Sequence, residues 1–171
     1  MTNKHYVSPA GSYLAPYGSF YDGCTKIPDD AVEVSGPPAH GRQFWDSVAE
    51  SWYDTKEYLG DYLADYRWRK ETGGIVFNAL NILTRDRDKL LIKSASEKAE
   101  ADNDGTIEKQ FKIANGFVTL TNAQIIDMHD ALIGHIDDCF AAEAATCQKI
   151  LDDILTSVAA VEADFDTEYS S

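Results

Sequence analysis

The sequence has few of the residues that would tie it to a disulfide scaffold, a zinc ribbon or a membrane. It contains three cysteines among 171 residues and no C-x-x-C pair, which argues against a disulfide framework and a zinc ribbon. No apolar run approaches the ~20 residues that a membrane-spanning helix needs. Residues 1–5 include no apolar segment, so we expect no secretory signal. These absences favour a protein made in the cytoplasm with reduced thiols.

Basic residues are also scarce, since 15 lysines and arginines stand against 29 acidic residues, for a net charge of −14. Binding to nucleic acid needs a basic face that neutralises phosphates, so this charge opposes it. The basic–aromatic cluster at residues 66–70 is too small to change that interpretation. We expect its aromatic residues to face the core, and Arg67, Arg69 and Lys70 to complement the C-terminus of a helix.

Motifs for catalysis or metal binding are missing, including G-x-S-x-G, the P-loop and H-E-x-x-H. His135 and Cys139 share a helix face, but no second pair completes a zinc site, so we expect Cys139 to be a buried apolar residue. The adjacent carboxylates at 137–138 and 152–153 diverge by about 100° on a helix, which excludes a catalytic dyad. The loop at 102–105 lacks the spacing of a calcium loop. We therefore expect no catalytic residue, cofactor or metal.

Residues 1–42 are predicted to form an extended arm. All five prolines of the chain lie there, and they prevent a long helix. The segment is nevertheless rich in aromatic residues, which disordered linkers lack. We expect short strands at 18–21 and 31–34. The arm's candidate contacts with a partner are Tyr13, Tyr17, Phe20 and Tyr21.

Residues 43–121 are predicted to be a compact α+β region. It should open with a small hairpin in which Trp45 faces Trp52, two further candidates for partner contact. A helix should follow over 56–71, presenting a face that includes Leu59 and Leu63 and ending at Gly73-Gly74. A short strand at 75–77 and a turn come next.

The second half of this region should contain another helix and another hairpin. The helix is expected over 87–101 with a thin apolar face of Leu90, Leu91 and Ala95. The dipeptide Asn115-Gly116 is a strong hairpin signal, and it joins the segments 109–114 and 117–120.

Residues 122–171 carry eleven acidic side chains and one basic one, together with an apolar stripe at helical spacing. One helix is predicted from Asn122 to about Glu162, roughly 60 Å long at ~1.5 Å per residue. Its steps fit an eleven-residue repeat better than a heptad, which favours a nearly straight bundle if copies assemble. This hypothesis fails if the helix packs wholly on its own chain. The candidate contact residues on the stripe are Leu132, Ile136, Ile150, Ile154, Val158 and Val161.

The order of short motifs over residues 56–155 also carries a resemblance. The motifs begin with Arg67-Trp68-Arg69, near the end of the first helix. They continue with Gly73-Gly74-Ile75, Thr84-Arg85, Phe111-Lys112, Asn115-Gly116, residues 118–122, Ile125-Ile126, residues 131–136 and residues 140–143. This order resembles a family of uncharacterised domains in tail and tail-fibre-associated proteins of bacteriophages and prophages. The sequence departs from it at Arg85, where the family often has Asp, and at Phe111, where it often has Trp.

The region before residue 56 is similar to the entry regions of tail-fibre assembly proteins. The segments that carry this similarity are 18–21, 27–34 and the pair Trp45 and Trp52. The resemblance implies association with a phage tail, and it supplies no catalytic residue.

The sequence thus predicts an α+β protein that acts as a non-enzymatic structural or accessory component of a phage tail or tail-fibre apparatus. Its partners would be other tail or fibre proteins, with a homo-oligomer formed through the C-terminal helix as a further option. It would be made in the host cytoplasm and reside in the virion tail. The alternative is a tail-fibre assembly chaperone that is absent from the finished particle. Both need the same adhesive surface, so the sequence does not separate them.

Overall fold

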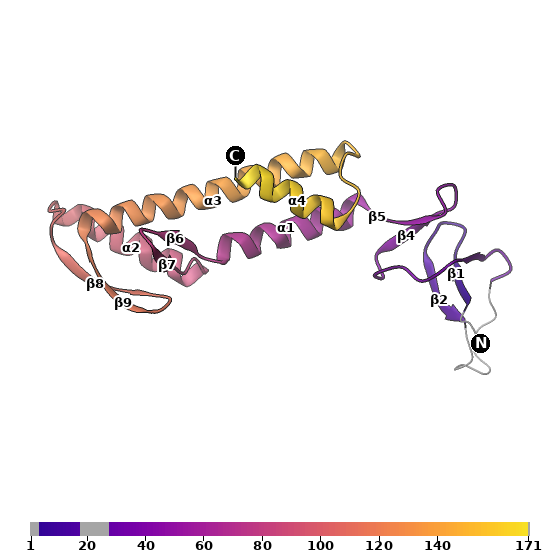
Figure 1. Ribbon diagram of the computed structural model, residues 1–171, viewed down its shortest axis with the longest axis horizontal. Helices are drawn as coiled ribbons and strands as arrows, with labels where there is room; N and C mark the ends of the chain where they lie inside the picture. Colours follow the sequence, from indigo (N-terminus) through magenta and orange to yellow (C-terminus); the bar gives the residue numbers. More distant parts are fainter. Residues whose placement is uncertain (1–3, 18–27, 171) are drawn as a thin grey trace. The chain divides into compact units, whose positions relative to one another are not determined.

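The computed structural model describes residues 4–17 and 28–170, and the described chain is an α+β protein with four helices and small antiparallel sheets (Figure 1). It divides into two compact units. The first contains residues 1–62 and 149–161, and the second contains residues 63–148 and 162–171. No helix in the described segments is both long and apolar enough to cross a bilayer.

The first unit contains a three-stranded sheet and a hairpin. Strands β1 (Lys4–Val7), β2 (Tyr13–Tyr17) and β3 (Val32–Val34) are antiparallel in the order β2-β1-β3. Strands β4 (Gln43–Asp46) and β5 (Ser51–Asp54) form the hairpin, and Trp45 lies opposite Trp52 as predicted. Gly11 has a φ of +84°, and a Cβ there would lie 2.5 Å from the carbonyl oxygen of Trp45. The close approach of these two segments therefore requires glycine.

Helix α1 (Lys56–Thr72) begins in the first unit and ends in the second, close to the predicted bounds. Leu59 and Leu63, which the sequence placed on the face that this helix presents, are both buried. Strands β6 (Ile75–Phe77) and β7 (Leu80–Ile82) follow as a hairpin, then α2 (Asp86–Asp102). Strands β8 (Glu108–Ile113) and β9 (Gly116–Thr121) form a further hairpin, whose turn residues Ala114 and Asn115 lie one position before the predicted pair Asn115-Gly116. Gly116, the first residue of β9, has a φ of +137°, a backbone conformation that favours glycine.

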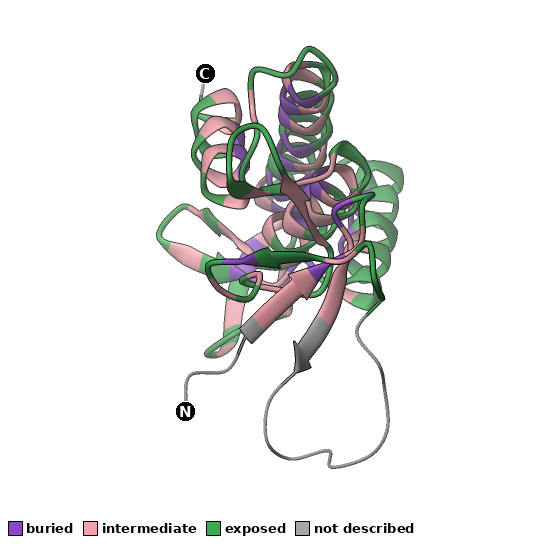
Figure 2. Cartoon of the chain, turned by 90° about the vertical axis from the view of Figure 1, so that its right-hand side faces the viewer, coloured by how far each residue is buried: buried purple, intermediate pink, exposed green. Residues whose placement is uncertain are grey.

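The core of the second unit is built from β7, α2, β8, β9 and the helix α3 (Asn122–Leu151). Positions on α3 alternate between buried and exposed at steps of three and four, so one side packs and the other faces solvent (Figure 2). The buried side chains of this core are Ile82, Ile92, Ala99, Ile113, Leu120, Ile125, Met128 and Leu132.

The buried face of α2 differs from the predicted one. Ile92, Ser96 and Ala99 are buried, whereas Leu90 and Leu91 are 69% and 54% exposed. The prediction left out Ile92, whereas Ala95, the third residue of the predicted face, does pack partly buried against the core. The helix instead turns the face with Ile92 and the small side chains toward the core, where close packing to neighbouring elements is possible.

The prediction of one long C-terminal helix is wrong. Helix α3 ends at Leu151, and a separate helix α4 spans Val158–Tyr169. Asp153 has a φ of +59°, and the amides of Asp153 and Ile154 bond to the carbonyls of Ile150 (3.2 Å) and Lys149 (2.9 Å). This pair of bonds is the Schellman motif that ends a helix. Apolar periodicity continues across the break, which is why the stripe alone did not reveal it.

Side chains stabilise the break from both ends. Lys56 donates to the carbonyl of Leu151 at 2.6 Å and pairs with Asp153 at 2.8 Å, so an otherwise unpaired helix-end carbonyl is satisfied. At the start of α4, the hydroxyl of Ser157 accepts a hydrogen bond from the amide of Ala160 at 3.3 Å. Ser157 is therefore the N-cap of α4.

Candidate functional site

The aromatic candidates of the first unit form a cluster. The rings of Trp45 and Trp52 lie 5.3 Å apart in a T-shaped arrangement, and Tyr13 meets Trp52 at 5.8 Å, also edge to face. The indole N–H of Trp52 donates to the carbonyl of Gly36 at 3.2 Å. All three rings are half-buried. The cluster thus packs within its own unit while keeping part of its surface in solvent.

The other three candidates of the arm are not among the side chains that the structure describes. Phe20 and Tyr21 lie outside the described residues, and the side chain of Tyr17 does too.

Most of the residues on α3 and α4 that were predicted to contact a partner are buried or half-buried within the chain itself. Leu132, Ile150 and Val161 are at most 2% exposed, Ile136 packs against the core, and Val158 is half-buried. These positions serve the chain's own fold, because α3 and α4 use their apolar stripe to pack internally. The predicted adhesive stripe is therefore wrong, with the exception of Ile154, which is 66% exposed.

Other apolar side chains are exposed instead. In the second unit they include Val76, Leu90, Leu91 and Phe117 on α2 and on the hairpin strands, and also Trp68, Ile107, Ile133 and Phe140. Val76 and Phe117 are more than 70% exposed. Near Leu91 and Phe111 there is a hollow of about 30 Å³, which is room for about one water molecule and not for a substrate.

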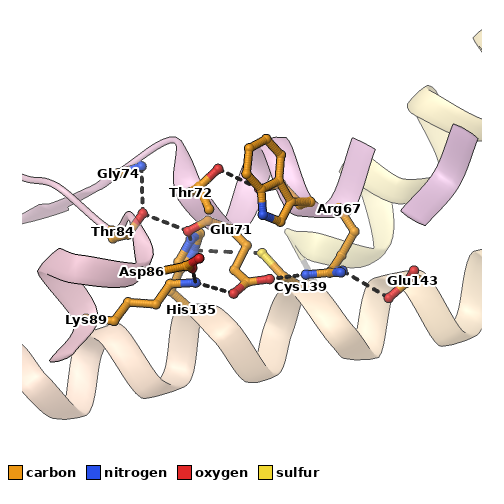
Figure 3. Close-up of polar contacts among 11 residues, drawn as sticks. Arg67, Glu71, Thr72, Gly74, Thr84, Asp86, Lys89, His135, Cys139 and Glu143 are labelled. Atoms are coloured by element: carbon orange, nitrogen blue, oxygen red, sulfur yellow. Dashed lines mark hydrogen bonds and ion pairs between the residues drawn. The ribbon is translucent and has the colours of Figure 1, made fainter. Parts of the chain in front are cut away.

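The most densely connected polar group is a network around Glu71 at the end of α1 (Figure 3). Glu71 is 8% exposed, and its carboxylate pairs with Arg67 on the same helix and with Lys89 on α2. Arg67 also pairs with Glu143 on α3 at 3.1 Å. The network therefore links three helices of the second unit.

Charge keeps Glu71 ionised. Burial by itself would raise the pKa of this carboxyl, but the hydrogen bond and charge of Lys89, together with the charge of Arg67, lower the pKa below its ordinary value. A carboxylate fixed between two cations is a poor general base, because its proton affinity is reduced. The arrangement is suited to holding helices together.

His135 extends the network on its other side. Its Nε2 lies 3.2 Å from the backbone carbonyl of Glu71, and its Nδ1 lies 2.8 Å from the hydroxyl of Tyr169. A carbonyl only accepts, so Nε2 carries the proton and Nδ1 accepts from Tyr169. Thr84 also donates to the carbonyl of Glu71, at 2.7 Å, and accepts from the amide of Gly74 at 2.9 Å. These contacts satisfy the C-terminal end of α1.

Cys139 lies beside this histidine. Its sulfur is 4.0 Å from Nδ1 of His135, and the residue is fully buried, as the sequence predicted. Burial, reinforced by the negative charge of Glu71, raises the pKa of the thiol to about 11. The residue is therefore a thiol at neutral pH and not a thiolate nucleophile. The described parts of the chain contain no group of three or more His, Cys, Asp or Glu side chains placed to hold a metal ion.

Alkylation should distinguish the two described cysteines. We expect iodoacetamide at neutral pH to modify the half-buried Cys147 and to leave Cys139 unmodified until the protein is unfolded, since Cys139 is both buried and protonated. Peptide mass spectrometry after a short exposure, with and without denaturant, measures both sites. Equal modification of the two cysteines in the folded protein would contradict this placement.

Arg69 and Lys70 lie in the last turn of α1, as the sequence predicted, but Arg67 and Trp68 were misplaced. Arg67 does not complement the helix end but pairs with two carboxylates, and its guanidinium lies 4.5 Å from the ring centroid of Phe140. Trp68 is 52% exposed and does not face the core. The spacing of Arg67 and Glu71, four residues apart, could have suggested one pair. Nothing in the sequence pointed to Glu143 or Lys89.

Comparison with known proteins gives a family. No curated protein and no solved structure matches the chain. A family model matches residues 54–169. This range includes every residue of the Glu71 network and all four helices, α1 to α4. The chain therefore belongs to the family described as Domain of unknown function (DUF4376).

Proposed function

We propose that this protein is a non-enzymatic component of a bacteriophage tail or tail-fibre apparatus, made in the host cytoplasm, that acts through contacts with other proteins. The observation that carries the protein-contact role is the set of large apolar side chains held in solvent by regular secondary structure, chiefly Val76, Leu90 and Phe117. Exposed apolar side chains of this size are the kind of surface that a protein partner covers.

The chemistry of the second unit supports the same proposal. Its buried ionisable groups are used in pairing: Glu71 with Arg67 and Lys89, and His135 with Tyr169. The hollow near Phe111 is too small for a substrate. The phage assignment itself is supported by the order of motifs over residues 56–155, from Arg67-Trp68-Arg69 to residues 140–143.

Quantitative mass spectrometry of purified, washed phage particles tests this proposal. We expect the chain at a fixed, low ratio to the major tail protein, as for a resident component built into a symmetric assembly. Absence from the particles with abundance in infected cells would replace the proposal by the alternative of a fibre-assembly chaperone. Absence from both would contradict the phage assignment.

A further inference from the structure

One edge of strand β9 has no partner within the described chain. β9 pairs with β8 along its whole length, from Gly116 opposite Ile113 to Thr121 opposite Glu108 (Figure 1). Just beyond the end of β8, the amide of Ala114 donates to the carbonyl of Asn81 in β7 at 3.2 Å. No backbone hydrogen bond among residues 4–17 and 28–170 joins β9 to any strand other than β8. Its outer row of N–H and C=O groups therefore pairs with no strand of the described chain.

The sequence and register of this edge strand lack the features that usually protect such strands. Natural proteins guard an open edge with lysine, proline, a bulge or an inward-pointing charge. The sequence of β9, Gly-Phe-Val-Thr-Leu-Thr, contains no proline and no charged residue, and its register with β8 is regular. Phe117 is 71% exposed and Thr119 is exposed too. The strand is thus suited to pairing with another extended backbone.

The charge of the chain favours a second copy of this protein as the partner of β9. The chain has a net charge of −14, so two copies repel wherever acidic side chains would meet. Residues 116–126 contain no charged side chain at all. Two copies can therefore approach along β9 without placing like charges opposite one another. An isologous contact of this kind, in which each copy presents the same strand, is the commonest form of dimer.

We propose that two copies of this protein pair edge to edge through antiparallel β9 strands, with Thr119 on the two-fold axis. The two hairpins would then form a four-stranded sheet in the order β8-β9-β9-β8. Thr119 of one copy would lie opposite Thr119 of the other. Phe117 would lie opposite Thr121, and Val118 opposite Leu120. Threonine pairs and aromatic–β-branched pairs are favourable across strands.

Charge substitutions at Thr119 test this pairing on the purified full-length chain. Sedimentation equilibrium over a concentration series should give the unmodified protein twice its chain mass of 18.9 kDa. Thr119→Lys and Thr119→Glu should each be monomeric, because like charges would oppose each other on the axis. An equal mixture of the two variants should recover the dimer, because opposite charges then meet.

The matched control is Gln110→Lys on β8. Gln110 lies opposite Thr119 on the same exposed face, but one strand away from the open edge. This variant should dimerise like the unmodified protein. Far-ultraviolet circular dichroism checks that every variant is folded.

An uncharged substitution tests the same pairing if a charge at Thr119 prevents folding. In a Cys24→Ser, Cys147→Ser background, Thr119→Cys should form a disulfide-linked dimer with oxidised glutathione, because residues opposite on paired strands lie within disulfide reach. Gln110→Cys in the same background should not.

Three results would overturn the proposal: a monomer at every concentration, a dimer that persists in both Thr119 charge variants, or a mixture that stays monomeric. The proposal is independent of the phage assignment, since its tests use purified protein and the assignment is tested in particles. Either can fail without the other.

Discussion

Replacing Phe165 with alanine should lower the free energy of unfolding by about 4 kcal/mol, the cost of removing a fully buried aromatic side chain and leaving a cavity. Phe165 is 0% exposed on α4. Its ring meets Tyr66 of α1 edge to face at 5.3 Å and stacks on Tyr169 at 6.3 Å. Urea denaturation followed by circular dichroism measures the change.

The matched control is Phe140→Ala on α3. Phe140 is 50% exposed and its main specific contact is the guanidinium of Arg67, so we expect a loss of about 1 kcal/mol or less. Equal losses for the two variants would show that α4 does not anchor the second unit through Phe165.

Replacing Glu71 with glutamine should cost about 3 kcal/mol of the free energy of unfolding at neutral pH, as for breaking a buried ion pair by removing one partner. The side chains of Glu71, Arg67 and Lys89 are 11%, 17% and 17% exposed, so the two cations would lose their shared carboxylate while largely shielded from water. Chemical denaturation of both proteins gives the difference.

The size of this loss should depend on pH. The pKa of Glu71 is lower in the folded chain than its ordinary value of about 4.3. Its contribution is therefore fully present above that ordinary value and is lost as the pH falls through the lowered pKa of the folded protein. The difference between Glu71→Gln and the unmodified protein should accordingly shrink on acidification below about pH 4.

Asp65→Asn is the control for this effect. Asp65 pairs with Arg69 on the same helix at 3.1 Å, but both side chains are about half exposed or more. Such a surface pair contributes about 0.5 kcal/mol, so this variant should be nearly as stable as the parent. A Glu71→Gln loss no larger than that of Asp65→Asn would contradict the structural role of the network.

The candidate site could be predicted only in part. The facing pair Trp45 and Trp52 follows from residues close in sequence, since a short hairpin places its strands opposite each other. The Glu71 network joins Arg67 to Glu143, 76 residues apart, and Glu71 to Lys89, 18 residues apart. The packing of α2 and α3 against α1 brings these groups together. No local sequence pattern encodes how the three helices align along one another.

By itself, the sequence determined the local elements of this protein. The bounds of α1, the strand at 75–77 and the hairpin around Asn115-Gly116 follow from helix stops, strand propensity and turn chemistry, which act over a few residues. Only the tertiary structure decided which apolar residues are buried and where the last helix breaks. Leu132 and Leu90 are both leucines on helices, yet one is 1% exposed and the other 69%. The difference arises from which face each helix turns toward its neighbours, a choice made by packing across the whole unit.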